Sequence, residues 1–211
     1  MVLLIASSCN TVDETYKAIR IKDQEWMIGN LGVDKFRNGD IIPEAKTYKE
    51  WEEASDNLSP AWCYLNNDST NGIKYGKLYN WYAVIDPRGL APKGWHIPND
   101  QEWQVMIDHL GGSKNAAYSL KSKVGWEILS DSNFVTRVIG NGSGNNLSGF
   151  NAMPSGIRDS DSFIPGWCVF WSYKEGSVRE PLTFSIVPQS SRVDRSRQYK
   201  GVGASLRCIK D

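Results

Sequence analysis

The segment from Tyr75 to Trp103, YGKLYNWYAVIDPRGLAPKGWHIPNDQEW, restricts the fold more than any other part of the chain. Its large aromatic residues stand among glycines and prolines, which disfavour long regular elements. Near its end, Asn99 and Glu102 form a capping box, which predicts the start of a helix. The chain holds nine tryptophans, and we expect most of them to fill a core that regular elements leave incomplete. The apolar stripe of the predicted helix comprises Trp103, Met106, Ile107 and Leu110, and Gly111 and Gly112 end it.

Shorter elements are predicted on both sides of this segment. Tyr16–Leu31 predicts a strand, a tight turn at Lys22–Gln24 and a second strand. Thr47 and Glu50 form another capping box, before a short helix that turns Trp51 and Ala54 inward. This order of strands, helices and further strands, with no linker between them, predicts one α+β domain. Further helices are expected within 76–85 and 113–123, strands within 166–173, 181–187 and 202–209, and polar loops at 66–72, 140–149 and 188–200.

Charge and hydropathy limit the partners of the chain. The 24 basic and 24 acidic residues cancel and are scattered, whereas a nucleic-acid surface needs a concentrated basic face. We therefore expect no nucleic-acid partner. No segment approaches the roughly 20 apolar residues that a membrane-spanning helix needs.

The N-terminus, MVLLIASSC, resembles the end of a lipoprotein signal peptide, in which small residues precede a cysteine that is then lipidated. We expect residues 1–9 to be a signal-peptide remnant with Cys9 as the lipidation site, residues 10–18 a polar tether, and residues 19–211 the folded domain. This predicts an exported protein of the outer membrane or cell surface that contacts the membrane only through a lipid anchor. The alternative is an ordinary hydrophobic N-terminal strand with a chance cysteine.

Residues suited to catalysis are few. His96, within GWHIP, is expected to be packed, and His109 lies late in a helix, where the helix dipole favours a surface cation. No G-x-S-x-G motif is present, so we expect no enzyme; a water-exposed His96 beside carboxylates in a cleft would favour one. Cys63, Cys168 and Cys208 allow one disulfide or none. No C-x-x-C motif or Cys/His cluster points to structural zinc.

Binding residues are sought among exposed aromatic and polar side chains. Indole and phenol rings can stack on sugars, although each of these rings is also a candidate for the core. Loop oxygens can bind calcium, which makes calcium an optional cofactor, although plain turn residues are the alternative. The basic loop 188–200 could meet an acidic glycan or be a solvated loop. The candidates are Trp62, Tyr64, Trp167 and Trp171 for sugars, Asn66, Asp68 and Asn71 for calcium, and Arg192 and Arg195 for an acidic glycan.

Three ordered motifs accompany the aromatic segment: IPNDQEW, SGFNAMPSGIR and the closing GASLRCIKD. Together they resemble the Fibrobacter succinogenes major paralogous domain family over residues 19–211. This resemblance implies a C-type-lectin-like fold, in which short helices pack on a small twisted antiparallel sheet with long irregular loops. It also implies a disulfide between Cys63 and Cys208. IPNDQEW and the closing strand are similar to segments of the formylglycine-generating enzymes, but Cys168 and Cys208 do not match the active-site cysteine pair of those enzymes.

The sequence therefore favours a non-catalytic, surface-exposed binding module whose partner is a glycan or a cell-surface protein. Two alternatives remain. The first is a structural component of a surface assembly, and the second is an enzyme on a scaffold like that of the formylglycine-generating enzymes.

Overall fold

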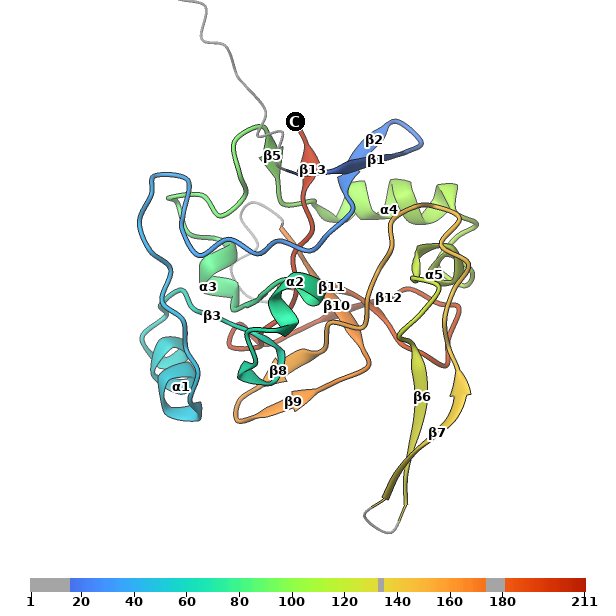
Figure 1. Cartoon of the computed structure of the whole chain (residues 1–211). Helices are drawn as coiled ribbons and strands as arrows, with labels where there is room; N and C mark the ends of the chain where they lie inside the picture. The colour runs from blue at the N-terminus through green and yellow to red at the C-terminus, as the bar shows by residue number, and fades with distance from the viewer. Residues whose placement is uncertain (1–15, 133–134, 174–180) are drawn as a thin grey trace, which may run out of the picture.

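The computed structural model describes residues 16–132, 135–173 and 181–211. A four-stranded antiparallel sheet joins the two ends of this part of the chain, in the order β1-β2-β13-β5 (Figure 1). Its strands are β1 (Ala18–Ile21), β2 (Gln24–Met27), β13 (Ile209–Lys210) and β5 (Trp95–His96). Ile209 pairs with Trp26 on one side and with His96 on the other. The predicted strand, turn and strand within Tyr16–Leu31 are confirmed.

A second antiparallel sheet holds β10 (Cys168–Ser172), β11 (Leu182–Ile186) and β12 (Asp194–Arg197). Every residue of β10 is buried, as predicted for a core strand. The prediction of a loop over 188–200 is wrong in part, because β12 extends the sheet by pairing with β11.

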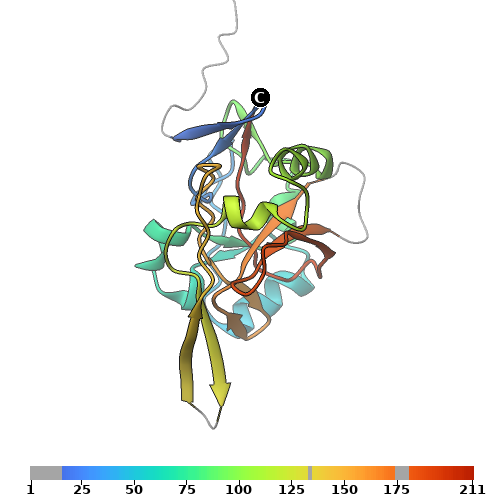
Figure 2. The ribbon, with the colours of Figure 1, turned by 90° about the vertical axis from the view of Figure 1, so that its right-hand side faces the viewer.

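Three two-stranded ladders complete the β structure. β3 (Trp62–Cys63) pairs with β4 (Leu78–Tyr79), and β8 (Ile157–Asp159) pairs with β9 (Ser162–Ile164). β6 (Glu127–Ser132) and β7 (Val135–Asn141) pair in an arm that projects from the body in both views (Figures 1 and 2). The predicted final strand over 202–209 is broken into isolated bridges before β13, including Tyr79 with Ala204 and Phe170 with Ser205.

The helices are short. Both predicted capping boxes are present, at Thr47 before α1 (Tyr48–Asp56) and at Asn99 before α4 (Asp100–His109). α5 (Ala116–Leu120) is also confirmed. The helix predicted within 76–85 is wrong in its first half, because β4 occupies it and α3 (Trp81–Val84) starts only after Asn80, whose side chain caps it. η1 (Leu65–Asn67) and α2 (Asn71–Tyr75) interrupt the predicted loop 66–72.

Aromatic rings fill the core. Eight of the nine tryptophans are buried, and only Trp167 is substantially exposed, at 41%. Trp103 of α4 lies with its ring centre 4.8 Å from that of Trp26 and 5.0 Å from that of Phe184. Trp103 thus packs α4 against both sheets, which confirms the predicted inward stripe of this helix and the predicted role of the indoles.

Buried cations hold the irregular loops. Arg158 donates to the carbonyls of Ala45 and Thr47, and its guanidinium lies 4.5 Å from the Trp51 ring. The three N–H groups of the Lys121 ammonium are shared among four carbonyls within hydrogen-bond distance, those of Gly142, Val187, Pro188 and Ser190. Burial lowers the pKa of Lys121 to about 8. Buried carbonyls need donors, and these side chains supply them where no strand does.

The predicted disulfide between Cys63 and Cys208 is not formed in the structure. Both residues and Cys168 are buried free thiols, and burial raises the pKa of each, to about 11 for Cys63 and Cys168 and to about 12 for Cys208. The physical reason is their placement, because Cys63 packs in a cluster with Trp51 and Cys208 in the larger cluster around Trp95.

The architecture is mixed α and β, with short helices and small antiparallel sheets, in agreement with the predicted α+β class. Within the described residues, no helix is long and apolar enough to cross a bilayer. Cys9 and the predicted signal-peptide remnant lie outside the described residues.

Candidate functional site

A cleft of about 770 Å³ opens between segment 84–91, strand β5 and the start of α4. Apolar residues of segment 84–91 and Ile97 form part of its wall, and polar side chains form the rest. The polar lining comprises Arg37, Asp86, His96, Asn99, Asp100, Gln101 and Tyr173.

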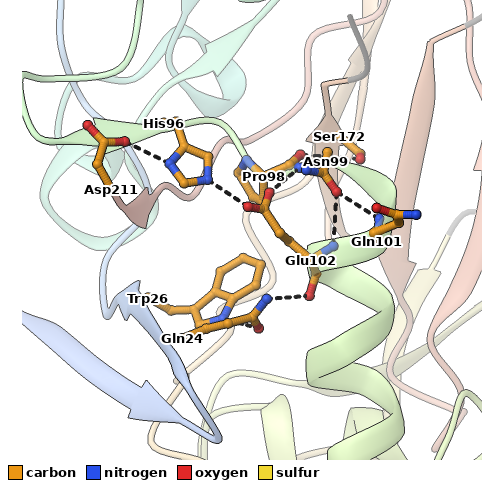
Figure 3. Close-up of polar contacts among 9 residues, drawn as sticks. All are labelled: Gln24, Trp26, His96, Pro98, Asn99, Gln101, Glu102, Ser172 and Asp211. Carbon is orange, nitrogen blue, oxygen red and sulfur yellow. Dashed lines mark hydrogen bonds and ion pairs between the residues drawn. The ribbon is translucent and has the colours of Figure 1, made fainter.

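His96 lies at the inner edge of this cleft, and both of its ring nitrogens are engaged. Nδ1 lies 2.8 Å from a carboxylate oxygen of Asp211, and Nε2 lies 2.8 Å from a carboxylate oxygen of Glu102 (Figure 3). The Glu102 hydrogen bond is the main cause that raises the pKa of His96, and burial opposes it. Because only an imidazolium can donate from both nitrogens to two carboxylates, this geometry favours the charged ring.

Glu102 ties the histidine to the start of α4. Its second carboxylate oxygen accepts from the backbone N–H of Asn99 at 2.7 Å. Burial raises the pKa of Glu102, but the bonds from His96 and Asn99 outweigh burial and lower it. The backbone carbonyl of Glu102 also accepts from the Gln24 side chain, so β2, β5, α4 and the C-terminal residue meet here (Figure 3).

The segment before α4 also contacts the end of β10. The carbonyl of Pro98 accepts from the Ser172 hydroxyl and from the backbone N–H of Tyr173. These bonds place the Tyr173 ring at the cleft, 6.5 Å from the ring centre of Trp81. His96 of the first sheet and Tyr173, which directly follows β10 of the second sheet, therefore line the same cleft.

The two carboxylates that line the cleft each have a cationic partner. Asp86 is paired with Arg88, and Asp100 accepts from Arg195, with 2.9 Å between Oδ2 and Nη2. Arg37 donates to the carbonyls of Ala91 and Trp95.

Three polar groups in the cleft have no hydrogen-bond partner among the described residues. They are the Arg37 Nη1 group, the Gln101 side-chain amide and the Tyr173 hydroxyl. A cleft with paired carboxylates, open hydrogen-bonding groups and apolar wall residues suits a polar ligand that can accept from Arg37.

The predicted sugar-stacking residues lie elsewhere. Of these candidates, Trp62 and Trp171 are buried, and their indole N–H groups donate to the carbonyls of Ile42 and Tyr79. Each ring instead fills core space between loops, which is the alternative that the sequence left open. Tyr64 is half-buried, with its ring centre 5.1 Å from that of Trp62. Trp167 is exposed but does not line the cleft.

The predicted calcium residues are engaged in local turns. One carboxylate oxygen of Asp68 accepts from both the backbone N–H and the hydroxyl of Thr70, which lowers the pKa of Asp68. The Asn71 amide donates to the Leu65 carbonyl, and Asn66 has a positive φ of 57°. In the part of the chain that the structure describes, no group of three or more His, Cys, Asp or Glu residues could hold a metal.

The two predicted basic residues have different surroundings. Arg192 is exposed and pairs with Asp194 at 3.4 Å. Arg195 of β12 reaches the cleft residue Asp100, with which it forms an ion pair.

Sequence reasoning singled out His96, Asn99 and Glu102 but missed that Asp211 joins them. It also missed Arg37 and Tyr173. Arg37 stands beside the turn signal Asn38-Gly39, and Tyr173 follows a predicted core strand, so no local pattern links either to the GWHIPND motif.

Residues 19–210 match the sequence model of one protein family, described as the Fibrobacter succinogenes major domain. Searches of curated proteins and of solved structures found no match.

Proposed function

The chain belongs to the Fibrobacter succinogenes major domain family, and we propose that it is a non-catalytic binding module that recognises a glycan in the His96 cleft. The observation that carries the proposal is the cleft itself, in which the open polar groups of Arg37, Gln101 and Tyr173 stand beside paired carboxylates and an apolar wall. Sugar hydroxyls are uncharged donors and acceptors, and the C–H faces of a pyranose suit the apolar wall of the cleft.

The geometry of His96 supports a binding role over a catalytic one. A general base needs a free nitrogen within hydrogen-bond reach of the proton that it removes. In His96, Glu102 and Asp211 occupy both nitrogens. The His96 ring of β5 therefore links Glu102 of α4 to Asp211 beside the cleft.

Export and anchoring complete the proposal. The N-terminal pattern ending at Cys9 supports a lipid-anchored protein of the outer membrane or cell surface. The family resemblance, with short helices packed on small antiparallel sheets, supports a C-type-lectin-like fold. Calcium remains an optional ligand, with Asn66, Asp68 and Asn71 as its candidates, and a cell-surface protein is the alternative partner to a glycan.

The test is a glycan-array binding assay on residues 10–211, with calcium and with EDTA. The comparison variant, Gln101→Ala with Tyr173→Phe, removes two open polar groups of the cleft without disturbing a described hydrogen bond of either side chain. Binding by the wild type that the variant loses would support the proposal, and loss of binding in EDTA would add calcium to it. Absence of binding to any glycan would refute it.

One observation favours a second candidate, an enzyme. The His96 side chain is 38% exposed and lies beside carboxylates in a cleft, an arrangement that also occurs in enzymes with a catalytic histidine. If catalysis occurs, His96→Gln and Glu102→Gln should each abolish turnover of a glycan that the array identifies. If the glycan is recovered intact from the wild type, the enzyme candidate fails.

A further inference from the structure

A separate pair of hollows surrounds Tyr199. One measures about 610 Å³ and the other about 270 Å³, and both have Ser55, Tyr199 and Gly201 in their walls. Tyr199 therefore stands between the two hollows, and it is 84% exposed. None of the residues that line them lines the His96 cleft, so this is a different place on the molecule.

The backbone beneath Tyr199 is fixed by three hydrogen bonds. The Tyr199 carbonyl accepts from the Val202 N–H at 3.1 Å, and the Lys200 carbonyl accepts from the Trp81 N–H at 2.9 Å. The Gly201 carbonyl accepts from the indole N–H of Trp51 at 2.7 Å.

Gly201 also packs tightly, because a β-carbon there would come within 2.6 Å of the Ser55 hydroxyl oxygen. An exposed ring on a fixed backbone binds with little loss of conformational freedom. The exposed Tyr199 ring is therefore carried on a fixed backbone rather than on the tip of a loose loop.

The smaller hollow adds a second ring and a set of acceptors. Tyr48 of α1 is 47% exposed, and its hydroxyl donates to Glu52 one turn later, which fixes the ring along the helix. No Lys or Arg lines this hollow. Its oxygen-bearing side chains are those of Tyr48, Glu52, Ser55, Asp56, Asp159, Ser160 and Tyr199.

This combination selects one class of ligand. A pyranose offers a C–H face to an aromatic ring and hydroxyl donors to carboxylates. The C–H face therefore suits the Tyr199 ring, and the hydroxyls suit the carboxylates of the smaller hollow. Two hollows flanking Tyr199 suit consecutive sugar units of one chain. A nucleic acid is disfavoured because Glu52, Asp56 and Asp159 would repel its phosphates.

A protein partner fits less well. A stable protein interface buries about 800 Å² on each side around an apolar centre that is depleted in charge. Here the exposed rings of Tyr48 and Tyr199 are bordered by carboxylates, with Arg197 and Lys200 at the larger hollow.

We infer that the Tyr199 groove, formed by these two hollows, is an oligosaccharide-binding site in which a sugar ring stacks on Tyr199. The inference rests on the proposal that this protein binds glycans, but it does not require the His96 cleft to be the glycan-binding site. It assigns the groove to a chain of sugars, which spans both hollows, rather than to a single sugar.

The experiment is a calorimetric titration of residues 10–211 with neutral hexasaccharides of glucose, xylose, mannose and N-acetylglucosamine, and with the matching monosaccharides. Tyr199→Ala should weaken the binding of the best hexasaccharide about tenfold or more, as expected of a central aromatic contact. Tyr199→Phe keeps the ring and should stay within about twofold of the wild type. Tyr118→Ala, which removes an exposed tyrosine of α5 that lines neither hollow, serves as the matched control.

The outcomes separate the two proposals. If the wild type binds a hexasaccharide and Tyr199→Ala binds it as tightly as Tyr118→Ala does, the Tyr199 groove is refuted while glycan binding stands. If Tyr199→Ala weakens binding and Gln101→Ala with Tyr173→Phe does not, the groove stands and the cleft fails as the glycan site. If the folded wild type binds no saccharide, both proposals fail. Circular dichroism confirms that each variant is folded.

Discussion

Replacing His96 by glutamine should lower the stability of the protein by an amount that shrinks as the pH rises. His96 makes two charge-assisted hydrogen bonds of 2.8 Å, and such bonds contribute about 1.5–3 kcal/mol when buried. The His96 side chain is 38% exposed and Asp211 is 58% exposed, so solvent screening reduces both. We assign about 1 kcal/mol to the Glu102 contact and roughly 0.3 kcal/mol to the Asp211 contact.

The sign of the pH dependence follows from the two pKa directions. The pKa of His96 is raised, chiefly by Glu102, so its contribution is complete below its ordinary value of 6.5 and is lost as the pH rises through the folded-state value. The pKa of Glu102 is lowered, because the bonds from His96 and Asn99 outweigh burial. Its contribution is complete above 4.5 and is lost as the pH falls through its own folded-state value. The hydrogen bonds of His96 therefore stabilise the fold most between pH 4.5 and 6.5.

Urea denaturation near pH 6 and near pH 9 measures this effect. His96→Gln should be about 1 kcal/mol less stable than the wild type near pH 6, and the difference should fall by more than half near pH 9. His109→Gln, which changes an exposed histidine of α4, should differ from the wild type by less than about 0.5 kcal/mol at both. The reasoning is refuted if His96→Gln matches the wild type near pH 6, or if its deficit grows with pH.

Three further predictions concern the core. Lys121→Met removes the ammonium that four carbonyls share as a donor. It should cost about 3 kcal/mol of stability and lower Tm by roughly 6–12 °C in a thermal melt. Lys123→Met changes an exposed lysine and should alter Tm little, so equal Tm values for the two variants would contradict the role of Lys121. In urea denaturation, Trp171→Ala should cost about 3–5 kcal/mol of stability, because its ring is fully buried. Trp167→Ala should cost less than about 1 kcal/mol, because that ring is exposed. A larger cost for Trp167→Ala than for Trp171→Ala would contradict these positions of the two rings. Adding a reductant should leave Tm unchanged within about 1 °C, because the described cysteines are free thiols, and a clear fall would restore the predicted disulfide.

Local signals in the sequence predicted local structure well. The capping boxes at Thr47 and Asn99 are present with both halves, because a cap depends on residues three apart. Short sequence patterns likewise predicted the turn after β1 and the buried strand β10. The helix expected within 76–85 was wrong in part, because Leu78 and Tyr79 pair with β3, which lies before η1 and α2 and outside the segment that carries the helical pattern.

The site was much harder to predict than the elements. Asp211 reaches His96 across 115 residues of chain, and Tyr173 joins the cleft only because its N–H bonds to Pro98. The aromatic candidates failed for a related reason. Trp171 and Trp167 have the same side chain and therefore the same hydrophobicity, so the sequence does not distinguish them. Only the tertiary packing buries Trp171 and leaves Trp167 exposed.

The central claim is that the protein binds a glycan without chemically changing it, through the cleft beside His96. The most direct test is an NMR titration of the isotope-labelled protein with a glycan that the array identifies, followed by analysis of the recovered glycan. We predict backbone amide shifts at residues 96–101 and at Tyr173, together with an intact glycan. A cleaved or modified glycan, or shifts that leave the cleft untouched, would contradict it.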